Sequence, residues 1–379
     1  MKKILFVVAL FIISQSRAEL YAQSADWRNI ENALSEIPDE NYCDQPYVVI
    51  APNGDWVCTL TTGPGGESGS GQHIVASISR DKGKTWSSLI NIEPGQKAPA
   101  AASWVIPYIT DYGRIYAFYT FNGDNIVFKP HSTLLGWYCF KYSDDNGRTW
   151  SHRYRIPLRK TTVDYFNQWH GSVQNFWGIS KPLTVKGNMY FSFSKILRGG
   201  SDEGITEGWL FKSDNINTEK DAGKLHWQLL PDGETGICAT ELGPVQEEHN
   251  IVSLKNGDLF CVYRTATGFI GKSYSRDGGH TWSKPDFLRY PDGRVVKHPR
   301  ACPRLFQSAN GKFLLWFHNN NGIKSPHDFR FRNPAWISGG VEKDGRIQWS
   351  QPEILLYDRD TAAGMSYPDL IEENGRFWV

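Results

Sequence analysis

SRDKGKTW (residues 79–86), SDDNGRTW (143–150) and SRDGGHTW (275–282) are three copies of one motif, Ser-x-Asp-x-Gly-x-Thr-Trp, without a mismatch. The motif suits a tight turn, because an Asp carboxylate accepts bonds from nearby backbone amides, Gly permits positive φ and Trp anchors the turn in apolar packing. Its Asp residues are therefore expected to be structural and not catalytic. Two degenerate copies are also expected, one from Ser213 to Trp227 with an insertion and one at 342–349.

A second repeated element, a glycine turn followed by an apolar strand, accompanies the motif along the chain. It occurs at Gly54, Gly113, Gly187, Gly257, Gly311 and Gly375. Short runs of Val, Ile, Phe, Tyr and Trp between turns are typical of an all-β chain. Each repeat is one sheet that buries its faces only against its neighbours, so six turns predict a six-bladed β-propeller of four-stranded antiparallel blades.

The sixth blade is expected to be incomplete, because the chain stops at Val379, just inside the strand after its glycine turn. Two explanations are open. The segment from about Asp26 to Cys43 completes the ring from the N-terminal side, or the chain is a fragment that lacks C-terminal strands. The second is favoured, since one short segment can hardly supply all the missing strands of a blade.

The N-terminus and the composition bear on location and partners. Residues 1–22 form a basic start, a short apolar run and a small-residue cleavage zone, as in a signal peptide. We therefore expect one propeller domain over 23–379 in a secreted or periplasmic protein, with an outer-surface location left open. The apolar run is too short to span a bilayer. A formal net charge of +1 without a Lys/Arg cluster argues against a nucleic-acid partner.

Six cysteines in an exported chain permit disulfides. Cys58, Cys139 and Cys261, however, each lie within a hydrophobic strand-like run. We expect these three to be buried free thiols that pack as small hydrophobic groups. Spacing signatures of zinc or EF-hand sites are not seen, so neither a metal nor a cofactor is expected.

The three intact motifs resemble the Asp boxes of bacterial neuraminidases, and the chain is identified as a divergent member of the sialidase superfamily. That resemblance implies site residues on the inner strands. Glu248, with Arg264 after it, is similar to the sialidase stretch in which a Glu opens an inner strand and an Arg ends the next. Tyr367 falls where the family places its nucleophilic Tyr, and Arg332 near the place of the last arginine of the triad.

The physical logic of this set is independent of the resemblance. A phenol needs a neighbouring carboxylate, such as Glu248, to take its proton before it can act as a nucleophile at neutral pH. Guanidinium groups such as Arg264 and Arg332 suit a sugar carboxylate. The alternatives are packing of Tyr367 as an inner-strand aromatic and a structural ion-pair role for the two arginines.

The chain departs from the family at two places. Where sialidases carry the first triad arginine, the sequence reads CDQPY (43–47), so Asp44 and Gln45 are expected to contact substrate there. His73 stands nearest to the position of the acid/base Asp, and an imidazole can serve as a general acid or base. Asp44 or Glu67 could substitute for it, and a structural His73 is the alternative.

A loop dense in aromatic and hydrogen-bonding groups supplies the last candidates, QWHGSVQNFW (168–177). Trp169 could stack on a sugar face, with His170 and Gln174 reading hydroxyls, or the loop could simply cover a blade edge. The sequence predicts an exo-acting, sialidase-like glycosidase for terminal, acidic sugars. The alternatives are a uronic-acid-directed lyase and a non-catalytic carbohydrate-binding propeller.

Overall fold

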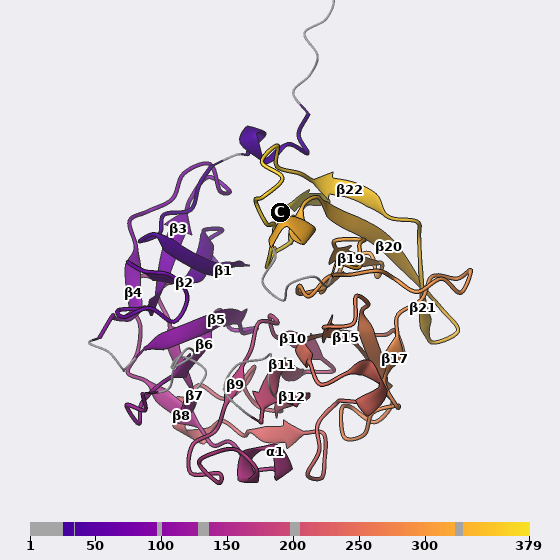
Figure 1. The fold of residues 1–379 in the computed structure, drawn as a ribbon. Coiled ribbons are helices and arrows are strands. Elements are labelled where there is room, and N and C mark those ends of the chain that lie inside the picture. Colours follow the sequence, from indigo (N-terminus) through magenta and orange to yellow (C-terminus); the bar gives the residue numbers. More distant parts are fainter. Residues whose placement is uncertain (1–25, 34, 97–100, 128–135, 198–204, 323–328) are drawn as a thin grey trace, which may run out of the picture.

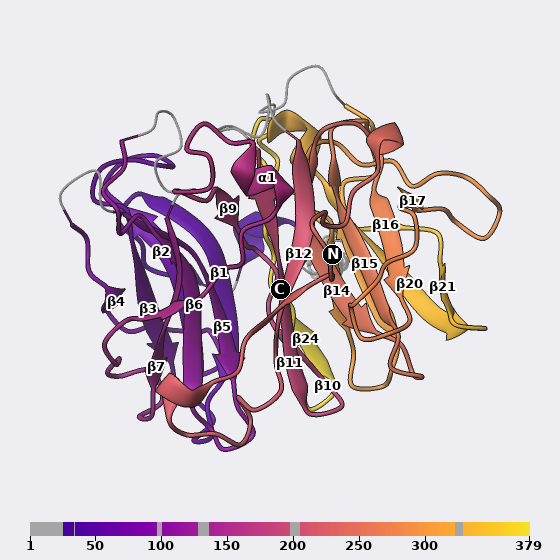
Figure 2. The same cartoon turned by 90° about the horizontal axis from the view of Figure 1, so that it is seen from below.

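The computed structural model describes residues 26–33, 35–96, 101–127, 136–197, 205–322 and 329–379. The predicted signal peptide lies outside them. Their strands form antiparallel sheets arranged in order around a central axis (Figure 1). From the side, the strands run between the two faces of the ring (Figure 2).

Five blades follow one another along the chain. Blade one holds β1 (Tyr42–Ile50), β2 (Trp56–Gly63), β3 (His73–Ser79) and β4 (Ile90–Glu93). Blade two holds β5 (Ala102–Ile109), β6 (Ile115–Phe121), β7 (Trp137–Ser143) and β8 (Tyr154–Ile156). Blade three holds β9 (Phe176–Trp177), β10 (Leu183–Val185), β11 (Asn188–Ile196), β12 (Thr206–Ser213) and β13 (Gln228–Leu230).

The fourth blade holds β14 (Gln246–Ser253), β15 (Leu259–Thr265), β16 (Gly271–Ser275) and β17 (Asp286–Phe287). The fifth holds β18 (Arg304–Gln307), β19 (Phe313–Phe317), β20 (Ala335–Lys343), β21 (Arg346–Trp349) and β22 (Glu353–Leu356). The described helices are short: η1 (Ile30–Asn32), α1 (Thr162–Tyr165), η3 (Ala222–Lys224), η4 (Thr240–Leu242) and η5 (Phe329–Arg332). None of them is long and apolar enough to cross a membrane.

The expected sixth blade is present only as a two-stranded sheet, β23 (Ile371–Glu373) and β24 (Arg376–Trp378), so the described residues form five blades and not six. This hairpin packs against blade one, where the ring of Trp378 meets that of Trp56 edge-on at 5.3 Å between centroids. The N-terminal segment pairs with the other neighbour: Asn29 bridges Tyr357, just after β22. A cavity of about 950 Å³ lies between these elements.

The glycine turns have the predicted geometry. Each joins the innermost strand of a sheet to the second strand, as Gly54 does between β1 and β2. The glycines at all six turns have positive φ, between 72° and 91°. Hydrophobic clusters fill the space between neighbouring blades, such as the one that joins blade two to blade three through Phe118 and Phe191.

The three intact motifs form the predicted turns between third and fourth strands. In the second copy, Asp145 accepts bonds from the backbone of Arg148 and Thr149 and from the Thr149 hydroxyl, at 3.1, 2.8 and 2.6 Å. The degenerate copy at 213–227 keeps part of this pattern, because Asn215 Oδ1 accepts from the His226 amide at 2.9 Å. The expected copy at 342–349 is wrong: Lys343 pairs with Arg346, and Asp344 and Gly345 form a two-residue hairpin with positive φ at both positions.

We expect Asp145→Ala to lower the free energy of unfolding by about 1–2 kcal/mol, because backbone and hydroxyl donors of one turn lose their acceptor. Chemical denaturation measures it, with exposed Asp111→Ala as the control. Binding and turnover at the ring centre stay unchanged if the motif is purely structural. A loss of activity in a fully folded Asp145→Ala protein contradicts that assignment.

Cys58, Cys139 and Cys261 are buried and free, as predicted. Each lies on the second or third strand of its blade, within the packing between sheets. They contribute apolar volume to the core.

Candidate functional site

The ends of the inner strands that lie away from the glycine turns carry the candidate residues. β1 and β14 each contain a bulge there, between Asp44 and Tyr47 and between Glu247 and Asn250. At each bulge one residue adopts positive φ: Gln45 at 55° and Glu248 at 58°. Tyr367, shortly before β23, has φ of 52°. Such a conformation costs roughly 1–2 kcal/mol in a non-glycine residue, so the surrounding structure must hold these side chains in place.

Tyr367 and Glu248 meet at the centre of the ring. The Tyr367 hydroxyl donates to Glu248 Oε1 at 2.7 Å. Arg264, near the end of β15, lies 3.5 Å from the Tyr367 oxygen and 2.7 Å from Glu248 Oε1 through Nη1. Desolvation raises the pKa of Tyr367 well above its usual value of 10, and the charge of Glu248 raises it further. The phenol of the resting pair is thus neutral and donates a hydrogen bond to the Glu248 carboxyl group.

The Tyr367 ring is held by apolar neighbours. It packs against a central cluster that includes Trp104, Trp177 and Cys302. The aromatic packing considered in the sequence reading is therefore present, together with the hydroxyl contact to Glu248. The two roles are compatible, because packing limits the orientations that the phenol can take.

Glu247, beside Glu248, was not among the predicted site residues. Its Oε1 accepts from Arg264 Nε and Nη2 at 2.9 and 2.6 Å, and from Arg300 Nη2 at 3.3 Å. The side chain is fully buried, and Oε2 has no hydrogen-bond partner among the described residues. Burial raises the pKa of Glu247 to about 7, although Arg264 opposes this rise. One carboxylate thus joins two arginines from neighbouring blades.

Arg300 and Arg332 lie side by side next to this pair. Arg332 is the last residue of η5; its Nη2 donates to the Arg300 carbonyl oxygen at 2.9 Å and its Nη1 donates to Ser366 at 3.0 Å. Both arginines are only 6% exposed. Burial lowers the pKa of Arg300 to about 10, which still leaves it protonated at neutral pH. Three guanidinium groups therefore gather on the side of blades four and five.

Blade one contributes carboxyl groups to the opposite side. Asp44 is buried and accepts from the Tyr42 hydroxyl at 3.3 Å. Burial raises the pKa of Asp44 to about 8, and the charges of Glu67 and Glu248 add to this rise. Asp44 is therefore protonated at neutral pH. Gln45, its neighbour, uses its amide to donate to the Gly178 carbonyl at 3.4 Å.

His73 does not contact this cluster within the part of the chain that the structure describes. Its Nδ1 lies 2.8 Å from the Gly71 carbonyl oxygen and its Nε2 3.8 Å from the Glu40 carboxylate. These contacts fit the alternative structural role of His73.

The loop with Trp169, His170 and Gln174 lies beside α1 at blade three, near the rim in Figure 1. Gln174 is buried and donates to Asp164 of α1 at 3.1 Å, which is the contact of a residue that holds the loop. Trp169 is partly exposed and His170 exposed. The structure shows no contact between these three side chains and the cluster around Tyr367 among the described residues.

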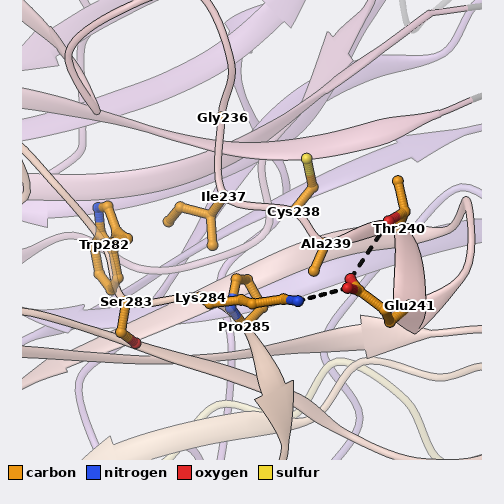
Figure 3. A pocket seen from close by; sticks show the side chains of 10 residues that line it. All are labelled: Gly236, Ile237, Cys238, Ala239, Thr240, Glu241, Trp282, Ser283, Lys284 and Pro285. Atoms are coloured by element: carbon orange, nitrogen blue, oxygen red, sulfur yellow. Dashed lines mark hydrogen bonds and ion pairs between the residues drawn. The ribbon is translucent and has the colours of Figure 1, made fainter.

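A second hollow, of about 380 Å³, is lined by residues 236–241, which lead from β13 to β14, and by residues 282–285, between β16 and β17 (Figure 3). Cys238 and Trp282 line it, and Lys284 pairs with Glu241 across it. Its lining residues include no tyrosine bonded to a glutamate such as the Tyr367–Glu248 pair. No group of three or more His, Cys, Asp or Glu in the described ranges is arranged to hold a metal.

Sequence reasoning missed Glu247 and Arg300. Glu247 lies on the inner strand β14 and Arg300 shortly before the inner strand β18, and the resemblance implied site residues on the inner strands. Arg300 was passed over because the family pattern accounts for arginines at other positions. A contact between blades four and five also cannot be read from spacing along the chain.

Comparison with known proteins agrees with the propeller fold. The family model of the BNR repeat-like domain matches residues 74–379. A Hadza microbial sialidase has a similar structure, with a TM-score of 0.58 and 17% identity over 83% of this chain and 58% of its own. The NanB sialidase of Streptococcus pneumoniae gives 0.59 and 16% over 89% of this chain and 65% of its own. The intramolecular trans-sialidase of Ruminococcus gnavus gives 0.55 and 15%, over 87% and 88%. At such identities the likeness shows the fold alone.

Proposed function

Because the chain belongs to the BNR repeat-like domain family, within the sialidase superfamily, we propose that it is a glycoside hydrolase that removes terminal acidic sugars. The observation that carries this proposal is the 2.7 Å bond from the Tyr367 hydroxyl to Glu248, with Arg264 beside both. A phenol bonded to a glutamate, with guanidinium groups beside it, fits a nucleophile and its base next to an anion-binding side.

In the proposed first step, Tyr367 Oη attacks the anomeric carbon while Glu248 takes the phenolic proton. The bond from the anomeric carbon to the departing oxygen breaks, and Asp44 donates its proton to that oxygen. In the second step Asp44, now a carboxylate, takes a proton from water as the water oxygen attacks the anomeric carbon. Tyr367 leaves and regains its proton from Glu248. Superfamily members are noted for using Tyr where other glycosidases use a second carboxylate.

We assign the proton-donor role to Asp44 in preference to His73. Asp44 interacts electrostatically with Glu248 and Tyr367, and its raised pKa keeps a proton available near neutral pH. His73 instead contacts the Gly71 carbonyl and Glu40. A general acid requires a proton to give and a place beside the reacting bond. Asp44 fits these two requirements better than His73.

The proposal is tested by trapping the covalent intermediate. A sugar with fluorine next to the anomeric carbon and fluoride as leaving group forms the intermediate faster than it is hydrolysed. We expect intact-mass spectrometry to show one added sugar and peptide mapping to place it on Tyr367. Probes built on N-acetylneuraminic acid and on glucuronic acid cover two classes of acidic sugar, and the Tyr367→Phe protein is the control.

The other outcomes are distinct. A lyase would form no adduct but would convert a polymeric uronide to an unsaturated, ultraviolet-absorbing product through the same Tyr and arginines. A carbohydrate-binding propeller would bind acidic sugars without either change. An adduct on any residue other than Tyr367 would overturn the assignment of the nucleophile.

We also propose that the protein is exported, which rests on the signal-like pattern of residues 1–22. Expression of the full chain with its native N-terminus tests this. The mature N-terminus found outside the cytoplasm is expected to begin near Gln23.

A further inference from the structure

Blade one has no arginine where the family resemblance led us to expect one. Asp44 and Gln45 occupy that part of β1, and the Gln45 amide donates to the backbone of blade three. That side of the centre therefore carries the protonated carboxyl group of Asp44 and the amide of Gln45, which already donates a hydrogen bond. A substrate carboxylate bound there would face Asp44 and the nearby charge of Glu67.

The guanidinium group of Arg264 makes contacts within the protein. All three of its side-chain nitrogens contact Glu247, Glu248 or the Tyr367 hydroxyl. These contacts fix the nucleophile and its base in position. Arg264 is accordingly a positioning residue for Tyr367 and Glu248, and Arg300 and Arg332 are the two other cations beside it.

Arg300 lies next to Arg264 and Arg332. The Glu247 carboxyl group contacts the guanidinium groups of both Arg300 and Arg264, and the Arg300 carbonyl oxygen accepts a hydrogen bond from Arg332. The three side chains thus form one connected group that spans blades four and five. Through Glu247, Arg300 is joined to Arg264, whose Nη1 contacts both Glu248 and the Tyr367 hydroxyl.

Resting on the proposed function, we propose that Arg300 binds the substrate carboxylate together with Arg332 and takes the place of the arginine that blade one lacks. The anionic group of the sugar then points to blades four and five, and the departing oxygen points to Asp44. This orientation follows from charge, because the carboxylate meets guanidinium groups and the leaving group meets the proton donor. Glu247 is the residue that positions Arg300.

The test compares Arg300→Gln with the intact protein on pairs of substrates, a charged free acid and its uncharged methyl ester. The probes are 4-methylumbelliferyl glycosides of N-acetylneuraminic acid and of glucuronic acid, each as the free acid and as the methyl ester. Gln can still donate to Glu247 but carries no charge. Arg294→Gln, at a surface arginine that is 60% exposed and pairs with Asp292, is the matched control.

For the accepted free acid we expect Arg300→Gln to lower kcat/KM by about 10- to 100-fold, mainly through KM. For the methyl ester we expect less than about a threefold change, since the lost charge has no partner there. Arg300→Lys should lose less kcat/KM on the free acid than Arg300→Gln, because Lys keeps the positive charge but lacks the forked donor geometry of a guanidinium group. An equal loss on acid and ester would show a structural role and overturn the proposal.

Binding measurements distinguish the Arg300 proposal from the hydrolase proposal. Calorimetry in the Tyr367→Phe background measures the affinity for the same free acids and esters without turnover. Affinity that requires both Arg300 and the free carboxylate supports the Arg300 proposal, even if the intact protein hydrolyses nothing and the hydrolase proposal fails. Hydrolysis of a free acid that is indifferent to Arg300→Gln overturns the Arg300 proposal alone. If no acidic glycoside binds, both are overturned.

Discussion

Replacing Tyr367 by Phe is expected to lower kcat on an acidic glycoside by about 10³-fold or more, because the variant has no oxygen with which to form the covalent intermediate. KM should change little. Phe keeps the ring that packs against Trp104 and Cys302, so the site stays ordered. Initial rates with a fluorogenic glycoside measure the loss, and thermal unfolding checks that the variant is folded.

Tyr290→Phe is the matched control for that substitution. Tyr290 is also a buried tyrosine, in blade four, and its hydroxyl has no described hydrogen-bond partner, so its removal should leave activity unchanged. Glu248→Gln should lower kcat as well, since an amide can accept the Tyr367 bond but cannot take the proton. If Tyr367→Phe keeps an activity within about tenfold of that of the intact protein, Tyr367 is not the nucleophile, because the loss of a nucleophile usually lowers activity far more.

The repeats were predictable because turn chemistry is local. Gly54 and its equivalents need positive φ, and Asp145 bonds residues three and four positions ahead, so short stretches of sequence carry the whole signal. The 342–349 copy failed for the same reason. Asp344 and Gly345 form a two-residue hairpin, and Asp and Gly are also residues of the motif.

The site was only partly predictable, because its contacts join distant segments. Tyr367 and Glu248 were expected as a pair from the family pattern, and they lie 2.7 Å apart across 119 positions of sequence. Arg300 carried no pattern of its own. His73 was chosen by its distance along the chain from the first motif, whereas the orientation of β3 and the neighbouring loop decides what its ring contacts.

Asp44→Asn is the second substitution with a large expected effect, and the leaving group decides its size. With an alkyl or glycan leaving group, kcat/KM should fall by about 10²–10⁴-fold, the usual contribution of a general acid. With a nitrophenyl leaving group, which departs as a stable anion, the loss should be under about tenfold for the same reason. His73→Asn is the comparison: a leaving-group-dependent loss in that variant, and not in Asp44→Asn, would return the acid role to His73.

The pH dependence of the intact protein gives an independent check on the role of Asp44. Asp44 has a pKa of about 8 in the folded protein against 3.8 as the ordinary value, so it is protonated below about pH 8. Activity on an unactivated glycoside should therefore fall as pH rises through about 8. Glu67→Gln should move that fall to lower pH, because one of the charges that raises the pKa of Asp44 is gone.

The same pKa determines the sign of the stability effect. Between pH 4 and 8 the unfolded chain releases the Asp44 proton and the folded protein keeps it, so stability falls as pH rises across this window. Asn has no proton to release, so the melting temperature of Asp44→Asn relative to the intact protein should rise from pH 5 to pH 8. A flat difference would mean that Asp44 is ionised in the folded state. It would then have no proton to give a leaving group, and the proposed first step would need another acid.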